Sequence, residues 1–238
     1  MSLISNACAS VLAFGAREER DSPVADRFDL VIFDNDGVLV DSEWHANGIL
    51  AGLLTELGLP CTREECIRDY MGSTVARVRE IAQARIGRPL PPDLEDRYHE
   101  QLFEAFRTKL TAVPGVADVL AQLTTPSCVA SSGTHERIRL ALATTGLLRR
   151  FDGRIFSAQD VARGKPEPDL FLHAARTLRV RPDRCAVIED SPLGVEAANR
   201  AGMTAFGFAR LTLAERLTQA KGGVFRSMDE LPALLTTG

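Results

Sequence analysis

The sequence predicts an α/β protein in which a doubly wound parallel sheet carries an inserted bundle of helices. Leu30–Phe33 is a short, unbroken apolar run, typical of a strand covered on both faces. About seventy residues after this region show only the three- and four-residue spacing of apolar side chains that indicates helices. From Pro114 onward strand-like and helix-like segments alternate, which favours right-handed crossovers and a parallel sheet.

The helical stretch predicts a small bundle. Gly58-Leu59-Pro60, Gly72 and the prolines at 89, 91 and 92 interrupt the helical spacing, and no strand pattern lies between them. The helices are expected at residues 43–58, 62–71, 73–87 and 92–111. Four helices without a strand form a unit that can lie over a site on the sheet.

These segments predict a division of the chain into three parts. A cap domain is expected at residues 43–113. It interrupts a core domain of residues 28–42 and 114–238, and residues 1–27 are expected to be a weakly ordered extension. Within the later part of the core, strands are expected at 127–130, 154–156, 185–188 and 204–208. Helices are expected at 115–123, 133–146, 168–178, 192–201 and 213–220.

Composition excludes several classes of protein. The 238 residues include 45% hydrophobic and 25% charged residues, and the formal net charge is −4. A weakly acidic chain without a basic tract has no electrostatic attraction to nucleic acid or anionic membranes. The apolar runs are too short to span a bilayer. Five cysteines without a CxxC pair predict reduced thiols and a cytoplasmic location. We expect a monomer or a weak homodimer.

Two carboxylates follow the first predicted strand. Asp34 comes directly after Phe33, and Asp36 and Gly37 follow. Ligands of open parallel sheets bind outside the carboxyl ends of the strands, so these acids are expected to face a site. A hairpin turn is the alternative for Asp-Gly between apolar runs. A calcium loop fits poorly, because its fifth position, which needs an oxygen ligand, would be Val38.

A serine cluster follows the second predicted strand. Ser131, Ser132 and Gly133 lie between an apolar run and a helix, so that hydroxyl and backbone N–H groups at a helix start can bind an anion. We expect Ser131 to donate its hydroxyl to a phosphoryl oxygen and the amides of Ser132 and Gly133 to add donors. A plain helix N-cap is the alternative, since serine begins many helices.

A lysine and a second acidic pair complete the candidate site. Lys165 lies between Gly164 and Pro166, in a loop whose prolines restrict its path, although a solvated surface lysine remains the alternative. Glu189 and Asp190 follow another buried run. Together with Asp34 and Asp36 they would repel one another unless a hard cation lay among them. Oxygen ligands of this kind favour Mg²⁺.

The order of these motifs resembles that of the haloacid dehalogenase superfamily, from about Phe28 to the C-terminus. The matching segments are DNDGVLVDSE at 34–43, the serine after the second strand, GKPEPD at 164–169 and EDSPLG at 189–194. Each motif alone is weak evidence for this superfamily, but the motifs together are specific for it. The resemblance is to members with a helical cap inserted in a Rossmann-like core, the subfamily of β-phosphoglucomutases and sugar-phosphate phosphatases.

The resemblance implies a role for each matching residue. Asp34 would be the nucleophile and Asp36 the general acid and base, while Ser131 and Lys165 would hold the phosphate. Mg²⁺ would be bound by Asp34, the Asp36 carbonyl, Glu189 and Asp190. Gly72 falls at the position of a cap loop that selects the substrate.

We therefore expect a Mg²⁺-dependent phosphatase that hydrolyses a small phosphorylated metabolite through an aspartyl-phosphate on Asp34. A β-phosphoglucomutase-type mutase is the alternative. The mutase pattern has an arginine where this chain has Val75 and a histidine where it has Ala46, and both departures favour the phosphatase. A dehalogenase would not need Glu189 and Asp190 as metal ligands. A phosphonate hydrolase would need a cap lysine, and the predicted cap offers only Lys109.

Overall fold

The computed structural model of the chain describes residues 27–70 and 75–236. All but the last residue of the predicted extension 1–27 therefore lies outside the described residues. Gly72, expected in the substrate-selecting loop, lies outside them as well.

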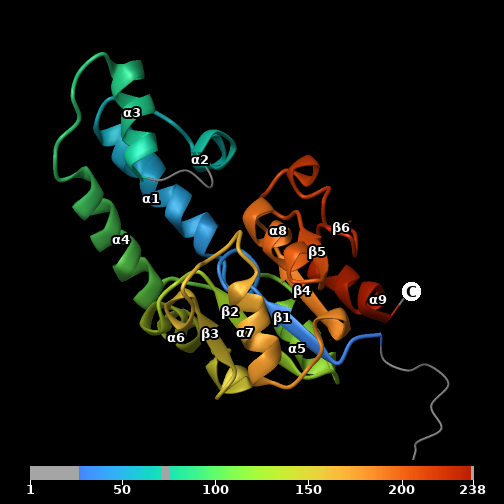
Figure 1. Cartoon of the computed structure of the whole chain (residues 1–238). Coiled ribbons are helices and arrows are strands. Elements are labelled where there is room, and N and C mark those ends of the chain that lie inside the picture. Colours follow the sequence, from blue (N-terminus) through green and yellow to red (C-terminus); the bar gives the residue numbers. More distant parts are fainter. Residues whose placement is uncertain (1–26, 71–74, 237–238) are drawn as a thin grey trace, which may run out of the picture.

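The described residues contain a six-stranded parallel sheet with the order β3-β2-β1-β4-β5-β6 (Figure 1). Its strands are β1 Leu30–Phe33, β2 Ser127–Ser131, β3 Ile155–Ser157, β4 Cys185–Glu189, β5 Thr204–Phe208 and β6 Val224–Phe225. The chain passes from β1 to β2 on one side and later crosses to β4 on the other. The sheet therefore reverses its direction of winding at β1, where ligands bind in folds of this type.

Helices cover both faces of this sheet. In the described chain from residue 114 onward, the α-helices are α5 Val116–Gln122, α6 His135–Thr144, α7 Asp169–Thr177, α8 Pro192–Arg200 and α9 Leu231–Thr236. Val31 and Phe33 of β1 belong to one apolar cluster with α5, α6 and α9, whereas Leu30 and Ile32 belong to another with α7 and α8. Alternate residues of a strand point to opposite faces, so the unbroken apolar run fills two cores.

Among the described residues, four helices lie between β1 and α5 along the chain and occupy the upper left of Figure 1. They are α1 Ser42–Glu56, α2 Arg63–Tyr70, α3 Val75–Ile86 and α4 Leu94–Thr108. Leu53, Leu54 and Cys66 are nearly inaccessible in an apolar cluster built only from this part of the chain. Phe106 and Leu110 instead join the cluster on the sheet. The predicted fold class, a parallel sheet with an inserted helical cap, is confirmed; the limits 43 and 113 remain a prediction.

One predicted helix is wrong. Residues 213–220 contain a 3₁₀ turn, Ala214–Arg216, and no α-helix. Leu217 and Ala220 are buried, and a side chain at Gly207 of β5 would meet both of them. Packing against the sheet therefore prevails over the helical spacing of this segment. Further 3₁₀ turns lie at Leu148–Phe151, Ala158–Asp160, Pro182–Arg184 and Met228–Glu230.

No sequence pattern predicts β6 or α9. A strand of two residues is too short to show alternation, and a helix of six residues completes fewer than two turns. Among the described helices, none has the length and apolar character that a membrane crossing requires.

Candidate active site

Three neighbouring strands bring polar side chains to one edge of the sheet. Phe33 of β1 is level with Ile188 of β4 and with Val129 of β2. Asp34 therefore lies next to Glu189, the last residue of β4, and close to Ser131, the last residue of β2. Asp34, Ser131 and Glu189 are all buried. Parallel strands in register thus place residues far apart in the sequence at one point.

Lys165 links two of these carboxylates. Its Nζ donates to Asp34 Oδ1 at 2.6 Å, to Glu189 Oε1 at 2.5 Å and to the carbonyl of Ala130 at 3.2 Å. Its side chain is only 6% exposed, and its ammonium lies 5.0 Å from the centre of the Phe171 ring. The alternative of a solvated surface lysine is therefore wrong, because this lysine is buried and paired.

Asp190 is the third acid of the cluster. Oxygen atoms of Asp34, Glu189 and Asp190 lie within 4.8 Å of one another. Two glycines permit this crowding. A side chain on Gly37, whose φ is +78°, would collide with the Asp190 carboxylate, and one on Gly194 would collide with the Glu189 carboxylate. Glycine at these positions lets the backbone approach the acids closely.

The cluster carries uncompensated negative charge. Three carboxylates face the single ammonium of Lys165, so two negative charges remain when all groups are ionised. Burial, with the nearby Glu189 carboxylate, raises the pKa of Asp34 to about 7. Burial and the Glu189 charge also raise the pKa of Asp190 well above its ordinary value. A divalent cation would relieve this repulsion.

The oxygen atoms of this cluster fit Mg²⁺. They are carboxylate oxygens, and the backbone carbonyl of Asp36 accepts no hydrogen bond from any described residue. Two hydrogen bonds constrain the Glu189 carboxylate, since its Oε2 accepts from the backbone N–H of Ser191 at 3.2 Å and from the Ser191 hydroxyl at 2.9 Å. Such bonds orient a ligand.

The serine cluster lies at the same edge. Ser131 and Ser132 line the cavity above the acids, with Ser131 only 1% exposed. Gly133 differs from the expectation, because its N–H donates to Ser131 Oγ at 3.1 Å and it does not line the cavity. That N–H is therefore not directed at a phosphate in this arrangement. Because the Ser131 oxygen is the acceptor in this bond, its hydroxyl hydrogen can donate toward the cavity.

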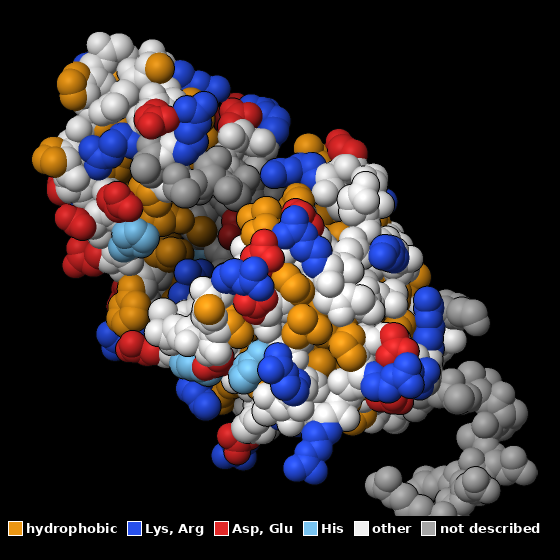
Figure 2. All heavy atoms as spheres, viewed as in Figure 1, with side chains coloured by type: hydrophobic (Ala, Val, Ile, Leu, Met, Phe, Trp, Pro, Cys, Tyr) orange, Lys and Arg blue, Asp and Glu red, His pale blue; other side chains and the backbone are white. Residues whose placement is uncertain are grey.

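The cavity itself has a volume of about 200 Å³. Figure 2 shows the molecular surface hollowed between the helices α1–α4 and the sheet. Its lining includes the expected residues Asp34, Asp36, Ser131, Ser132, Lys165 and Asp190, joined by Glu43, Ser191, Pro192, Thr212 and Arg216. The mixture of acids, hydroxyls and cations, with Glu43 contributed by α1, suits a polar ligand covered by the cap.

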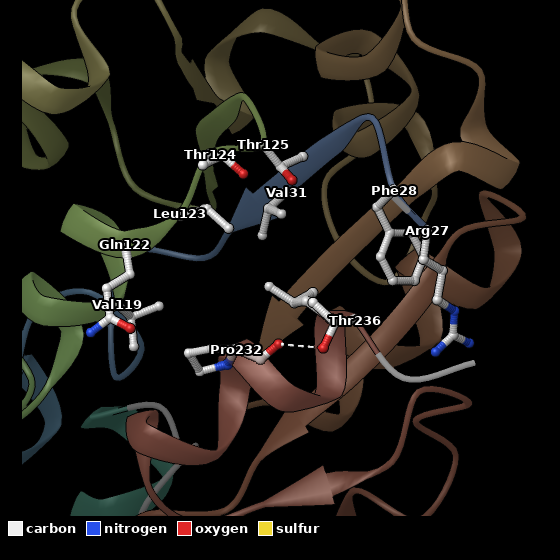
Figure 3. A pocket seen from close by; sticks show the side chains of 11 residues that line it. Arg27, Phe28, Val31, Val119, Gln122, Leu123, Thr124, Thr125, Pro232 and Thr236 are labelled. Atoms are coloured by element: carbon white, nitrogen blue, oxygen red, sulfur yellow. Dashed lines mark hydrogen bonds between the residues drawn. The ribbon is translucent and has the colours of Figure 1, made fainter. Parts of the chain in front are cut away.

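A second cavity, of about 120 Å³, lies elsewhere in the structure (Figure 3). It is bounded by Phe28 and Val31, by the segment that follows α5 and by α9, near the opposite end of β1 from Asp34. Leu123 and Leu235 contribute to an apolar lining that contains no carboxylate or histidine. It therefore has none of the carboxylate or imidazole ligands that a metal site would require.

Two ion pairs near the site join distant parts of the chain. Arg137 Nη2 on α6 donates to Asp36 Oδ1 at 3.0 Å. Arg210, after β5, makes two hydrogen bonds of 2.8 Å to the carboxylate of the buried Asp41, next to the start of α1. Sequence reasoning missed both, because the partners are 101 and 169 residues apart and no local pattern marks either arginine.

His135 and Arg77 lie outside the lining of the cavity above the acids. His135 Nε2 is 2.8 Å from Asp160 Oδ1, and Arg77 Nη1 donates to Glu80 on the exposed face of α3. Glu43 does line the cavity, and burial together with the Asp36 charge raises its pKa. Glu43 also accepts a weak hydrogen bond from Asn47 at 3.3 Å.

Comparison with curated proteins finds relatives of known activity. The chain is 29% identical over 209 residues to a 6-phosphogluconate phosphatase of Escherichia coli K12, covering 87% of this chain and 95% of that protein. It is also 29% identical over 195 residues to a β-phosphoglucomutase of Bacillus subtilis 168, covering 74% of this chain and 81% of the mutase.

Solved structures with the same fold and a matching family model identify the family of this chain. A haloacid dehalogenase family hydrolase of Deinococcus radiodurans R1, solved with bound phosphate and sodium, is 32% identical with a TM-score of 0.82. The match covers 89% of this chain and 96% of that one. Residues 28–202 match the model of the haloacid dehalogenase-like hydrolases. The chain belongs to the haloacid dehalogenase-like hydrolase family.

Proposed function

We propose that the protein is a Mg²⁺-dependent phosphatase that hydrolyses a small phosphorylated metabolite, with a sugar phosphate or a related monoester as substrate. The observation that carries this proposal is the buried contact of Lys165 with Asp34 and Glu189, beside Asp190 and below Ser131. It combines a nucleophile, a cation for phosphate and oxygen ligands for a metal. The similarity to 6-phosphogluconate phosphatase supports the substrate class.

Phosphate monoesters hydrolyse so slowly that enzymes accelerate the reaction by up to about 10²¹-fold. A general acid alone contributes roughly 10²- to 10⁴-fold. In the proposed reaction an Asp34 carboxylate oxygen attacks phosphorus, and the bond from phosphorus to the leaving oxygen breaks. Asp36 transfers its proton to that oxygen. The product is an aspartyl-phosphate, so one difficult displacement becomes two easier ones.

In the second step Asp36, now a carboxylate, accepts a proton from water while the water oxygen attacks phosphorus. The bond between phosphorus and Asp34 breaks, which restores the Asp34 carboxylate and releases inorganic phosphate. Lys165 and Ser131 would hold the transferring group through charge and hydrogen bonds. Mg²⁺, held by Asp34, Glu189, Asp190 and the Asp36 carbonyl, would stabilise negative charge on the phosphoryl oxygens.

The mutase alternative receives less support. Val75 stands at the position of the mutase arginine, and Arg77, two residues later, donates to Glu80 on an exposed helix face. Ala46 stands at the position of the mutase histidine, and neither His45 nor Arg77 lines the described cavity. A second phosphate would therefore lack the cap side chains that the mutase pattern provides.

Phosphate release from a panel of sugar phosphates and phosphorylated sugar acids tests the proposal. Wild-type protein with Mg²⁺ is expected to release phosphate, whereas Asp34→Asn or added chelator abolishes release. Borohydride reduction during turnover should convert Asp34 to an alcohol detectable by peptide mass spectrometry. Phosphate release that persists in Asp34→Asn would refute the aspartyl-phosphate. Cytoplasmic location and a monomer or weak homodimer belong to the same proposal, and sizing by light scattering checks the latter.

A further inference from the structure

Arg137 lies in the first turn of α6, the helix that follows the serine cluster. Its backbone N–H donates to Oγ1 of Thr134, the N-cap of α6, at 3.2 Å. Its guanidinium extends back toward the site, where Nη2 donates to Asp36 Oδ1 at 3.0 Å. The helix that follows Ser131 and Ser132 along the chain therefore also contacts the proposed general acid.

The same guanidinium contacts the cap. Its Cζ lies 5.0 Å from the centre of the Phe106 ring, near the end of α4. Phe106 is only 3% exposed, so its position is fixed by packing. A cation over an aromatic face is attracted by the ring. One side chain thus joins a core helix, the last cap helix and Asp36.

The contact leaves Asp36 able to act on a ligand. Oδ1 accepts the bond from Arg137, whereas Oδ2 has no partner among the described residues, and Asp36 lines the cavity. The planar guanidinium fixes the orientation of a carboxylate better than a flexible ammonium does. Glu43, on the cap side of the cavity, repels Asp36, and the positive charge of Arg137 offsets this repulsion.

We propose that Arg137 is a positioning residue that aims Asp36 at the leaving-group oxygen, and that its contact with Phe106 makes this aim depend on the placement of α4. The inference rests on the proposed phosphatase reaction. A displacement of about 1 Å from the productive geometry can cost about 10²-fold in rate. Arg137 itself does not need to contact the substrate.

The inference predicts a dependence on the leaving group. A strongly basic leaving oxygen needs a proton from Asp36 as the bond to phosphorus breaks, whereas a weakly basic phenolate leaves without one. Substituted phenyl phosphates change this basicity and keep the same ring in the cavity. The ratio kcat/KM reports the steps up to release of the phenol, so the later hydrolysis of aspartyl-phosphate does not affect it.

The test compares wild type with Arg137→Ala on phenyl, 4-nitrophenyl and 2,4-dinitrophenyl phosphate in the presence of Mg²⁺. We expect kcat/KM to fall about 10²-fold for phenyl phosphate and less than about tenfold for the dinitrophenyl ester. Arg139→Ala is the matched control, since Arg139 lies on an exposed part of the same helix. It removes the same charge and should leave all three values within about twofold of wild type.

Two further variants separate positioning from a purely structural role. Arg137→Lys keeps the charge without the planar fork, so it should recover part of the phenyl phosphate activity. Phe106→Leu keeps an apolar side chain and should give the same leaving-group dependence with a smaller loss. Thermal unfolding checks that each variant is folded under the assay conditions.

Equal loss of kcat/KM for all three esters in Arg137→Ala would overturn the inference and leave the phosphatase standing. A rise in KM alone would also overturn it, because it would indicate direct contact with substrate. If wild type hydrolysed no phosphate ester at all, the proposed function would fail and the inference with it.

Discussion

Lys165 and Asp34 form a buried ion pair in which Nζ lies 2.6 Å from Oδ1, and the same ammonium also reaches Glu189. A lysine in this position is relevant to both the stability of the fold and the proposed reaction. It offsets the mutual repulsion of carboxylates that would otherwise be buried together. It also holds the Asp34 carboxylate at the carboxyl end of β1, where ligands of parallel sheets bind.

Lys165→Met should lower stability and remove activity. Two buried carboxylates would lose their cation, and breaking a buried pair in this way costs about 3–5 kcal/mol. The loss is measured as a lower free energy of unfolding in urea, together with phosphate release in the presence of Mg²⁺. Lys221→Met, on an exposed lysine, is the control and should change neither quantity appreciably. Full activity in Lys165→Met would contradict the assigned role.

Asp34→Asn should stop turnover and stabilise the metal-free protein at neutral and higher pH. Burial raises the pKa of Asp34 from 3.8 to about 7, so the folded state binds this proton more tightly than the unfolded state. The stability contributed by this group is therefore present below about pH 4 and lost as the pH rises toward 7. Asparagine carries no charge at any pH.

The check is the difference in Tm between Asp34→Asn and wild type from pH 4 to pH 8 in the presence of a chelator. The difference should grow in favour of the variant across this range. Added Mg²⁺ should raise the Tm of wild type more than that of the variant, since a bound cation stabilises the folded state. A difference independent of pH would contradict the unfavourable burial of the Asp34 charge.

Gly194→Ala should weaken metal binding. Gly194 lies in α8, where alanine is otherwise favourable, but a Cβ at this position would collide with the Glu189 carboxylate. Displacement of such a group typically costs 10- to 100-fold in metal affinity, to be measured from the Mg²⁺ dependence of activity. Gly52→Ala is the matched control, because Gly52 lies in α1 and a Cβ added there would meet open space. It should raise stability by about 0.5–1 kcal/mol and leave metal affinity unchanged.

Arg210→Ala should destabilise the connection between the core and the helices α1–α4. Asp41 is buried, and its carboxylate would lose both hydrogen bonds from Arg210. The cost is expected to be about 3 kcal/mol in the free energy of unfolding. In a double-mutant cycle with Asp41→Asn, the double variant should lose less than the sum of the single losses. Additive losses would show that the two side chains do not interact energetically.

Asp41 lies where the chain enters α1, so its ion pair with Arg210 is placed at the connection between the sheet and the helices α1–α4. The backbone N–H of Asp41 donates to the carbonyl of Thr111 at 2.9 Å, and that of Val113 donates to Leu39 at 3.0 Å. The two chain segments that connect α1–α4 to the sheet are therefore hydrogen-bonded to each other. Arg210 adds a third segment, from the end of β5, to this connection.

Elements whose pattern is local can be predicted from the amino-acid sequence alone. The β-strand Thr204–Phe208 has the limits that its apolar run predicted, and the strands that end near Asp34, Ser131 and Glu189 were all expected. Each of these signals is contained in a few consecutive residues, because burial on both faces demands an unbroken apolar run. The acids and the serine at the strand ends could therefore be recognised before their contacts were seen.

Tertiary packing determines which side chains meet across long separations in the sequence and which local patterns are overruled. The contacts of Arg137 with Asp36 and of Arg210 with Asp41 depend on how helices and loops pack on the sheet, and no nearby residues encode them. Residues 213–220 carry helical spacing, yet packing against Gly207 prevents an α-helix. Local preferences are worth fractions of a kcal/mol per residue, so burial against a neighbouring strand decides the outcome.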